Sequence, residues 1–124
     1  YYDSKGTFKA DAENFPKFVK ETNETLKKIV PNYQMLSEGE IKINGNWKAY
    51  EIKFQGGGET ANGEKLNLWG RRLFIPMARP GVRSGYEITM FATSLSKEVK
   101  NVDDVGIKGE LGTILETFEP NQNF

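Results

Sequence analysis

The Asn-Gly pair at positions 44–45 is the sequence feature that most restricts the fold. Both central residues of a two-residue type I′ hairpin turn need positive φ angles, and Asn followed by Gly adopts them readily. Apolar and polar residues alternate on both sides, over 33–43 before the pair and 47–55 after it. We therefore predict two antiparallel strands joined here. Three consecutive glycines at 56–58 indicate the end of the second strand, so 56–65 is predicted to be a mobile loop.

Two further strands and two helices complete the predicted elements. Residues 66–76 are apolar on both faces of an alternating pattern, which is typical of a central strand, and a fourth strand is predicted over 86–95. An apolar stripe at i, i+3 and i+4 predicts an amphipathic helix over 15–30, which Pro31 ends. A second stripe predicts a helix over 108–118.

The elements run in the order helix, four strands, helix, in a chain of 124 residues, which is the size of one domain. Short connections make consecutive strands antiparallel neighbours. The predicted class is therefore α+β, with an antiparallel sheet of four or more strands and two helices packed on one face. We expect a single domain over 15–120, an irregular segment or strand remnant over 1–14, and a tail over 121–124.

The composition argues against several kinds of function. The chain has no Cys and no His, which removes thiol catalysis, Ser-His-Asp chemistry, zinc fingers and His-ligated metals. Seventeen basic and seventeen acidic residues cancel, which argues against a nucleic-acid binder. No apolar run approaches the roughly 20 residues of a membrane span. We expect no cofactor and no metal, and the oligomeric state stays open.

Three stretches, in this order, resemble the PsbP-like superfamily. Residues 15–33, a helix running into the letters PNY, are similar to the family's leucine-rich helix with its lP-[ND]-[FY] end. Residues 41–50 (IKINGNWKAY) are similar to its i-ING-x-x-A-y hairpin, and 114–118 (ILETF) to its il-x-SF terminus. The family includes the extrinsic PsbP protein of photosystem II, the Ran-binding Mog proteins, and DcrB-like bacterial lipoproteins and secreted proteins.

The resemblance implies a PsbP-like sandwich with the order α-β-β-β-β-α, in a non-enzymatic protein that binds or stabilises other macromolecules. It also implies a bacterial protein outside the cytoplasm, either periplasmic, secreted or a lipoprotein. The family opens with a strand hairpin bearing P-x-x-W, which has no match in this sequence. We expect that hairpin to be missing, or Tyr1–Lys9 to be its remnant, and a lipid anchor on a missing N-terminus stays open.

The arginines are unusually clustered, since Arg71, Arg72, Arg79 and Arg83 fall within one short window while the lysines are dispersed. A guanidinium group grips carboxylate or phosphate through two hydrogen bonds. One interpretation is therefore a site for an acidic protein surface or a small anion at the end of the third predicted strand. The other, which we favour, is pairing within the protein to the acidic C-terminal helix, or a solvated loop.

Trp47 and Trp69 are the remaining binding candidates, because Trp is enriched at interface hot spots. The alternation places Trp47 on the face opposite Tyr50, Ile52 and Phe54, at a sheet rim or toward solvent. The alternative, which we favour, is packing of a hairpin-end side chain against a neighbouring strand.

Three hypotheses of function follow. The first is a non-catalytic binding or assembly module of PsbP-like fold, outside the cytoplasm and of uncharacterised role. The second is a carrier of a small anion that uses the arginine cluster. The third, ranked last, is an enzyme based on carboxylate chemistry, and we predict that the protein is not an enzyme.

Overall fold

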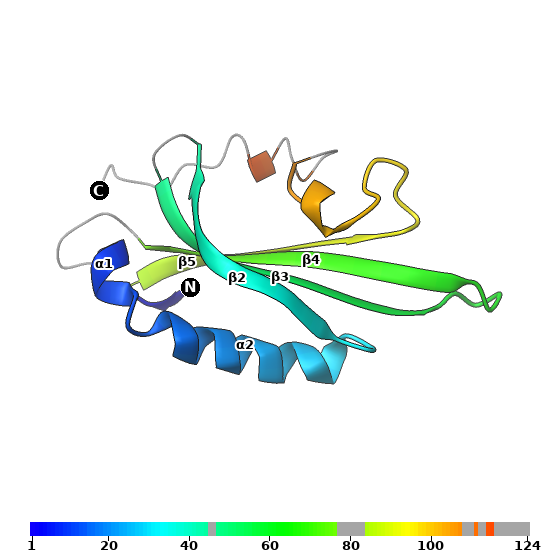
Figure 1. Ribbon diagram of the computed structural model, residues 1–124, viewed down its shortest axis with the longest axis horizontal. Coiled ribbons are helices and arrows are strands. Elements are labelled where there is room, and N and C mark those ends of the chain that lie inside the picture. The colour runs from blue at the N-terminus through cyan, green and yellow to red at the C-terminus, as the bar shows by residue number, and fades with distance from the viewer. Residues whose placement is uncertain (45–46, 77–83, 108–110, 112–113, 116–124) are drawn as a thin grey trace.

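The computed structural model describes residues 1–44, 47–76, 84–107, 111, 114 and 115 (Figure 1). Over these residues it has a five-stranded antiparallel sheet and two helices, in agreement with the predicted α+β class. In chain order the elements are β1 (Tyr2–Asp3), α1 (Phe8–Asp11), α2 (Phe15–Ile29), β2 (Gln34–Ile43), β3 (Trp47–Glu59), β4 (Lys65–Pro76), β5 (Ser84–Thr93) and the 3₁₀ turn η1 (Val102–Asp104).

The strands lie in the order β1-β5-β4-β3-β2, so the four long strands form a meander and β1 is added beside β5. Asn44 has a φ of 47°, in the left-handed region that the first central residue of a type I′ turn needs. Ile43 pairs with Trp47, so β2 and β3 are joined at the predicted place, but three residues separate the paired positions instead of the two of a type I′ turn. β4 lies inside the sheet, as its two apolar faces indicate.

The glycine run at 56–58 does not end β3, so the loop predicted over 56–65 is wrong in its first part. β3 continues to Glu59 and stays in register with β4 along the whole run. Glycine is needed here for close approach, because a Cβ on Gly56 would lie 2.7 Å from the carbonyl oxygen of Pro31. Pairing with β4 therefore outweighs the low strand propensity of glycine.

Helix α2 covers one face of the sheet (Figure 1). Its buried side chains form the predicted stripe of Phe15, Val19, Thr22 and Leu26. The first core cluster joins this stripe to the sheet and consists of Tyr2, Phe15, Val19, Leu26, Val30, Ile52, Phe54 and Phe74. The apolar period of the helix thus matches the face of β3 and β4 that it covers.

The described residues after β5, which we call the C-terminal segment (94–107, 111, 114 and 115), pack on the opposite face from α2, and not on the same face as predicted (Figure 1). The second core cluster lies there and consists of Ile43, Ala49, Leu73, Ile75, Met90, Val99, Val105 and Leu115. Because β4 is apolar on both faces, each face needs its own cover, and Val105 and Leu115 supply part of the second one. Most of the helix predicted over 108–118 lies outside the described residues.

A buried carboxylate holds the N-terminal segment. Asp11 is fully buried and accepts hydrogen bonds from the Tyr2 hydroxyl at 3.0 Å, the Ser4 hydroxyl at 2.6 Å and the Lys5 backbone N–H at 2.5 Å. Tyr2 itself pairs with Gly85 of β5. The carboxylate thus ties β1 to α1, and its burial is compensated by three donors.

Candidate functional site

The hairpin of β3 and β4 extends beyond the rest of the sheet (Figure 1). β2 pairs with β3 only as far as Gln55, and β5 pairs with β4 only as far as Leu68. From there to Glu59 and Lys65 the two strands pair only with each other. An open groove with a volume of about 720 Å³ lies along this part, beside the connection from α2 to β2. Small-molecule sites span about 300–1,000 Å³, so the groove is large enough for one.

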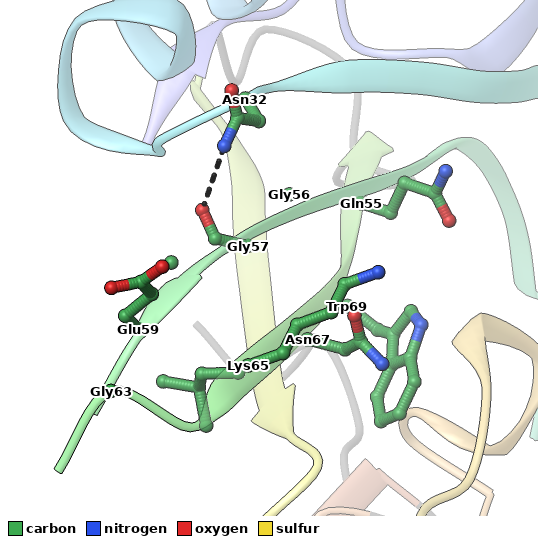
Figure 2. Close-up of a pocket in the computed structure, with 11 residues that line it drawn as sticks. Asn32, Gln55, Gly56, Gly57, Glu59, Gly63, Lys65, Asn67 and Trp69 are labelled. Carbon is green, nitrogen blue, oxygen red and sulfur yellow. Dashed lines mark hydrogen bonds between the residues drawn. The ribbon is translucent and has the colours of Figure 1, made fainter.

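Three cross-strand pairs form one face of this groove: Gln55 with Trp69, Gly57 with Asn67, and Glu59 with Lys65. Alternate residues of a strand share a face, so all six belong to the same face of the two-stranded part. Figure 2 shows these residues along the two strands, with Asn32 approaching Gly57 at the outer edge of β3. We call these six residues together with Asn32 the hairpin groove.

Both backbone edges of the hairpin groove are already hydrogen-bonded. At the β3 edge, the Gly57 N–H donates to the carbonyl oxygen of Pro31 at 2.9 Å, and its carbonyl oxygen accepts from Asn32 Nδ2 at 3.3 Å. At the β4 edge, the Asn67 N–H donates to Ser94 Oγ at 3.0 Å, and its carbonyl oxygen accepts from the Ser94 N–H at 2.9 Å. An extended peptide therefore cannot add a strand at these positions without displacing existing bonds.

The side chains of the hairpin groove, in contrast, keep unused hydrogen-bonding capacity. Neither the Asn67 amide nor the Trp69 indole N–H has a partner within the described part of the chain. The Gln55 side-chain NH₂ donates one hydrogen bond to Gln34 Oε1 at 3.0 Å, and the Gln55 side-chain oxygen is left to accept one. Trp69 is half-buried and packs against the second core cluster, which fixes the base of the ring. The groove thus presents fixed polar groups beside an aromatic surface.

The arginine cluster is not one site, because Arg71 and Arg72 are successive residues of β4 and point to opposite faces. Arg71 is buried, with 6% of its surface exposed. Its Nε donates to Glu51 Oε2 at 2.7 Å, its Nη2 donates to the same oxygen, and its Nη1 donates to the Val105 carbonyl oxygen at 2.6 Å. Lys53 extends this network from Glu51 at 3.9 Å to Asp103 of η1 at 3.0 Å. Arg71 therefore helps to hold the C-terminal segment on the sheet.

Arg72 lies on the face that α2 covers and pairs with Glu87, with 2.5 Å between Nη2 and Oε2. Its Nε is buried without a hydrogen-bond partner among the described residues. The small hollow beside it, of about 200 Å³, is lined by two carboxylates, Glu21 and Glu87. One guanidinium facing two carboxylates is not a favourable environment for an added anion.

Of the remaining predicted candidates, Arg79 and Arg83 lie outside the described residues. Trp47 is half-buried and packs against the second core cluster at the start of β3. Trp69 pairs with Gln55, which lies eight residues after Trp47 along β3. At about 3.3 Å per residue, Trp47 and Trp69 are therefore roughly 26 Å apart. Of the four candidates that the structure describes, only Trp69 lines the hairpin groove.

Residue types alone do not identify Gln55, Asn67 and the glycine run as parts of one site. Part of the signal is in the sequence, because Gln55, Gly57 and Glu59 alternate along one strand and Lys65, Asn67 and Trp69 alternate along the next. It could be used only once 56–58 was known to be strand rather than loop.

Three tyrosines have raised pKa values, and each phenol has a structural cause. Burial, followed by the neighbouring Asp11 carboxylate, raises the pKa of Tyr2 far above its usual range. Burial and a 2.7 Å hydrogen bond to Glu38 raise the pKa of Tyr50 to about 12. Burial raises the pKa of Tyr33, and the positive charge of Arg72 reduces this rise. None of the three lines the hairpin groove.

The described residues contain neither a cluster of metal ligands nor a membrane-spanning helix. They hold no group of three or more acidic side chains placed to bind a metal ion. They also hold no helix that is long and apolar enough to cross a membrane.

Comparisons of the chain with protein-family models, curated proteins and solved structures found no match.

Proposed function

We propose that this chain is a non-catalytic binding module that takes its ligand in the hairpin groove. The observation that carries the proposal is a contrast in hydrogen bonding. The described arginines are paired with carboxylates inside the fold, whereas Asn67 and Trp69 point unpaired groups into a groove of ligand size. Convergent polar groups beside an aromatic ring are the usual lining of a binding site.

A binding role without catalysis agrees with the chemistry of the groups present. Asp11 and Glu51 are buried carboxylates, and hydrogen-bond donors of the fold already engage both. The hairpin groove offers amides, an indole and backbone, which bind and orient a ligand but are poor proton-transfer groups near neutral pH. The alternative function, a carrier of small anions at the arginine cluster, gains no support from Arg71 and Arg72, because each already has a carboxylate partner.

The fold and location complete the proposal. The order of motifs supports a PsbP-like module that acts outside the cytoplasm, and the antiparallel sheet with α2 on one face is compatible with that assignment. In such a module the extended hairpin reaches beyond the sheet, so a ligand can approach it without contacting either core cluster (Figure 1).

The test is a titration of ¹⁵N-labelled protein, followed by NMR, with separate pools of neutral oligosaccharides, peptides and inorganic anions. We expect one pool to shift the amide signals of 56–58 and Asn67 and the indole signal of Trp69. Mass spectrometry of that pool afterwards should show its components unchanged. Shifts centred on Arg72 with the anions would favour the carrier, and chemical conversion of a component would show an enzyme. No shift in the groove with any pool would refute the proposal.

A further inference from the structure

We infer that the ligand of the hairpin groove is an uncharged saccharide chain, bound through its ring faces and hydroxyl groups. The inference rests on the proposed function and adds the chemical class of the ligand. Three properties of the groove lead to it: a floor with a glycine position beside an indole, amides with both donor and acceptor capacity, and balanced charge.

The floor of the groove is backbone rather than side chain. Gly57 stands opposite Asn67, so the row between Gln55 with Trp69 and Glu59 with Lys65 has a side chain on one strand only. A Cβ on Gly57 would lie 2.8 Å from the Leu66 carbonyl oxygen, so the position excludes larger residues. The groove that Trp69 lines, with a volume of about 720 Å³, is large enough for a ring-sized group. A pyranose ring is such a group, and its axial C–H bonds form an apolar surface that packs on an indole.

The side-chain amides of the groove have the same hydrogen-bonding capacity as sugar hydroxyl groups. A sugar hydroxyl both donates and accepts, and a primary amide does the same through its NH₂ and its carbonyl oxygen. The Asn67 amide has no partner within the described residues, and Gln55 keeps its amide oxygen after donating to Gln34. Asn32 donates to Gly57 and keeps its own side-chain oxygen. Polar groups on both sides of the floor can therefore bond the rim of a ring that stacks beside Trp69.

The charges argue against an ionic ligand. Glu59 and Lys65, the charged residues of the groove lining, are cross-strand partners of opposite sign, so the lining has no formal net charge. A phosphate, a sulfate or an acidic peptide would meet no net positive charge there. An extended peptide is further disfavoured because the bonds of Gly57 and Asn67 already occupy both strand edges. A neutral ligand recognised by side chains satisfies all of these observations.

Tryptophan fluorescence offers a direct test, because the chain has two tryptophans and one lies in the groove. Trp47→Phe leaves Trp69 as the reporter, and Trp69→Phe is the matched control with the same chemical change on the other indole. Defined neutral hexasaccharides with gluco, manno and N-acetylglucosamine units are titrated into each. We expect at least one to change the emission of Trp47→Phe in a saturable manner and to leave Trp69→Phe unchanged.

Two further measurements sharpen the test. Asn67→Ala should weaken the binding of that hexasaccharide by about tenfold, the effect of one buried hydrogen bond. Asn62→Ala, the same change at an exposed position outside the groove lining, should leave it unchanged. Affinity should be the same at about 50 mM and about 500 mM NaCl, because no charge pairing contributes. A thermal melt of each variant establishes that it is folded.

The outcomes separate this inference from the proposed function. If no hexasaccharide binds while peptides or anions still shift the groove signals, the saccharide assignment is wrong and the binding module stands. If hexasaccharides bind but Trp69→Phe and Asn67→Ala bind them as well as the wild type does, the site is elsewhere and both are wrong. A strong salt dependence would likewise overturn the assignment of a neutral ligand.

Discussion

Neutralising Glu51 should cost the protein a large part of its stability. Glu51 and Arg71 are 7% and 6% exposed, and the guanidinium group has this carboxylate as its ion-pair partner. Glu51→Gln leaves a buried cation without its counter-ion, which destabilises by about 3–5 kcal/mol. The whole fold of a chain this size is stable by roughly 6–19 kcal/mol. We therefore expect the melting temperature to fall by roughly 10–20 °C.

The double variant Glu51→Gln/Arg71→Met tests the cause. Removing both charges also removes the unpaired cation, so the double variant should be more stable than Glu51→Gln alone, even though Met no longer donates to the Val105 carbonyl oxygen. Urea unfolding followed by circular dichroism gives the free energies, with m-values checked for two-state behaviour.

The control is Glu40→Gln, the same change on an exposed pair. Glu40 lies 3.7 Å from Lys48, with about half of each side chain exposed, so its loss should cost less than about 1 kcal/mol. A cost for Glu51→Gln as small as that of the control, or a double variant as unstable as the sum of its single changes, would refute the reasoning.

Three further changes have defined outcomes. Asp11→Ala should lower the free energy of unfolding, measured by urea unfolding, by about 3 kcal/mol, because the Tyr2 and Ser4 hydroxyl groups lose their buried acceptor. The pKa of Tyr2 is higher in the folded than in the unfolded chain. Its contribution to the free energy of unfolding is therefore complete below about pH 10 and is lost as the pH rises further. Tyr2→Phe should make this decline at alkaline pH smaller. Gly70→Ala should cost about 1–3 kcal/mol by calorimetry, because its Cβ would overlap the buried Phe54 ring.

Each of these changes has a matched control. Asp3→Ala and Tyr1→Phe alter exposed residues of the same segment and should leave stability and its pH dependence almost unchanged. A Cβ on Gly58 meets nothing within 4 Å, so Gly58→Ala should be neutral or slightly stabilising. A control as damaging as its partner would show that the contacts named here are not the cause.

Alternation and turn chemistry predict most of the sheet. β2 and the start of β3 lie at the predicted places, because a positive φ at Asn44 and an alternating pattern on each side are local properties. The interior position of β4 is also predicted from its two apolar faces. These features depend on neighbouring residues, which a single sequence displays directly.

The features that sequence reasoning gets wrong depend on distant partners. The low strand propensity of glycine predicts that β3 ends at 56–58. Instead, these glycines pair with β4 and remain part of the strand. Arg71 and Arg72 are adjacent in the sequence but lie on opposite faces of the sheet. Arg71 pairs with a carboxylate 20 residues away, and Arg72 pairs with a carboxylate 15 residues away. The face that the C-terminal segment covers is likewise decided by the space that α2 leaves free, which no local pattern encodes.

The pairing of β1 with β5 has a consequence for the order of folding. Tyr2 meets Gly85, so this contact spans 85 − 2 = 83 residues of chain. A contact of such long range closes a large loop and gains little until the strands between its ends are in place. During synthesis, α2 emerges before β5, so the first core cluster cannot include a docked Tyr2 until β5 has been synthesised. We expect β1 to dock last and, in hydrogen exchange, to open first.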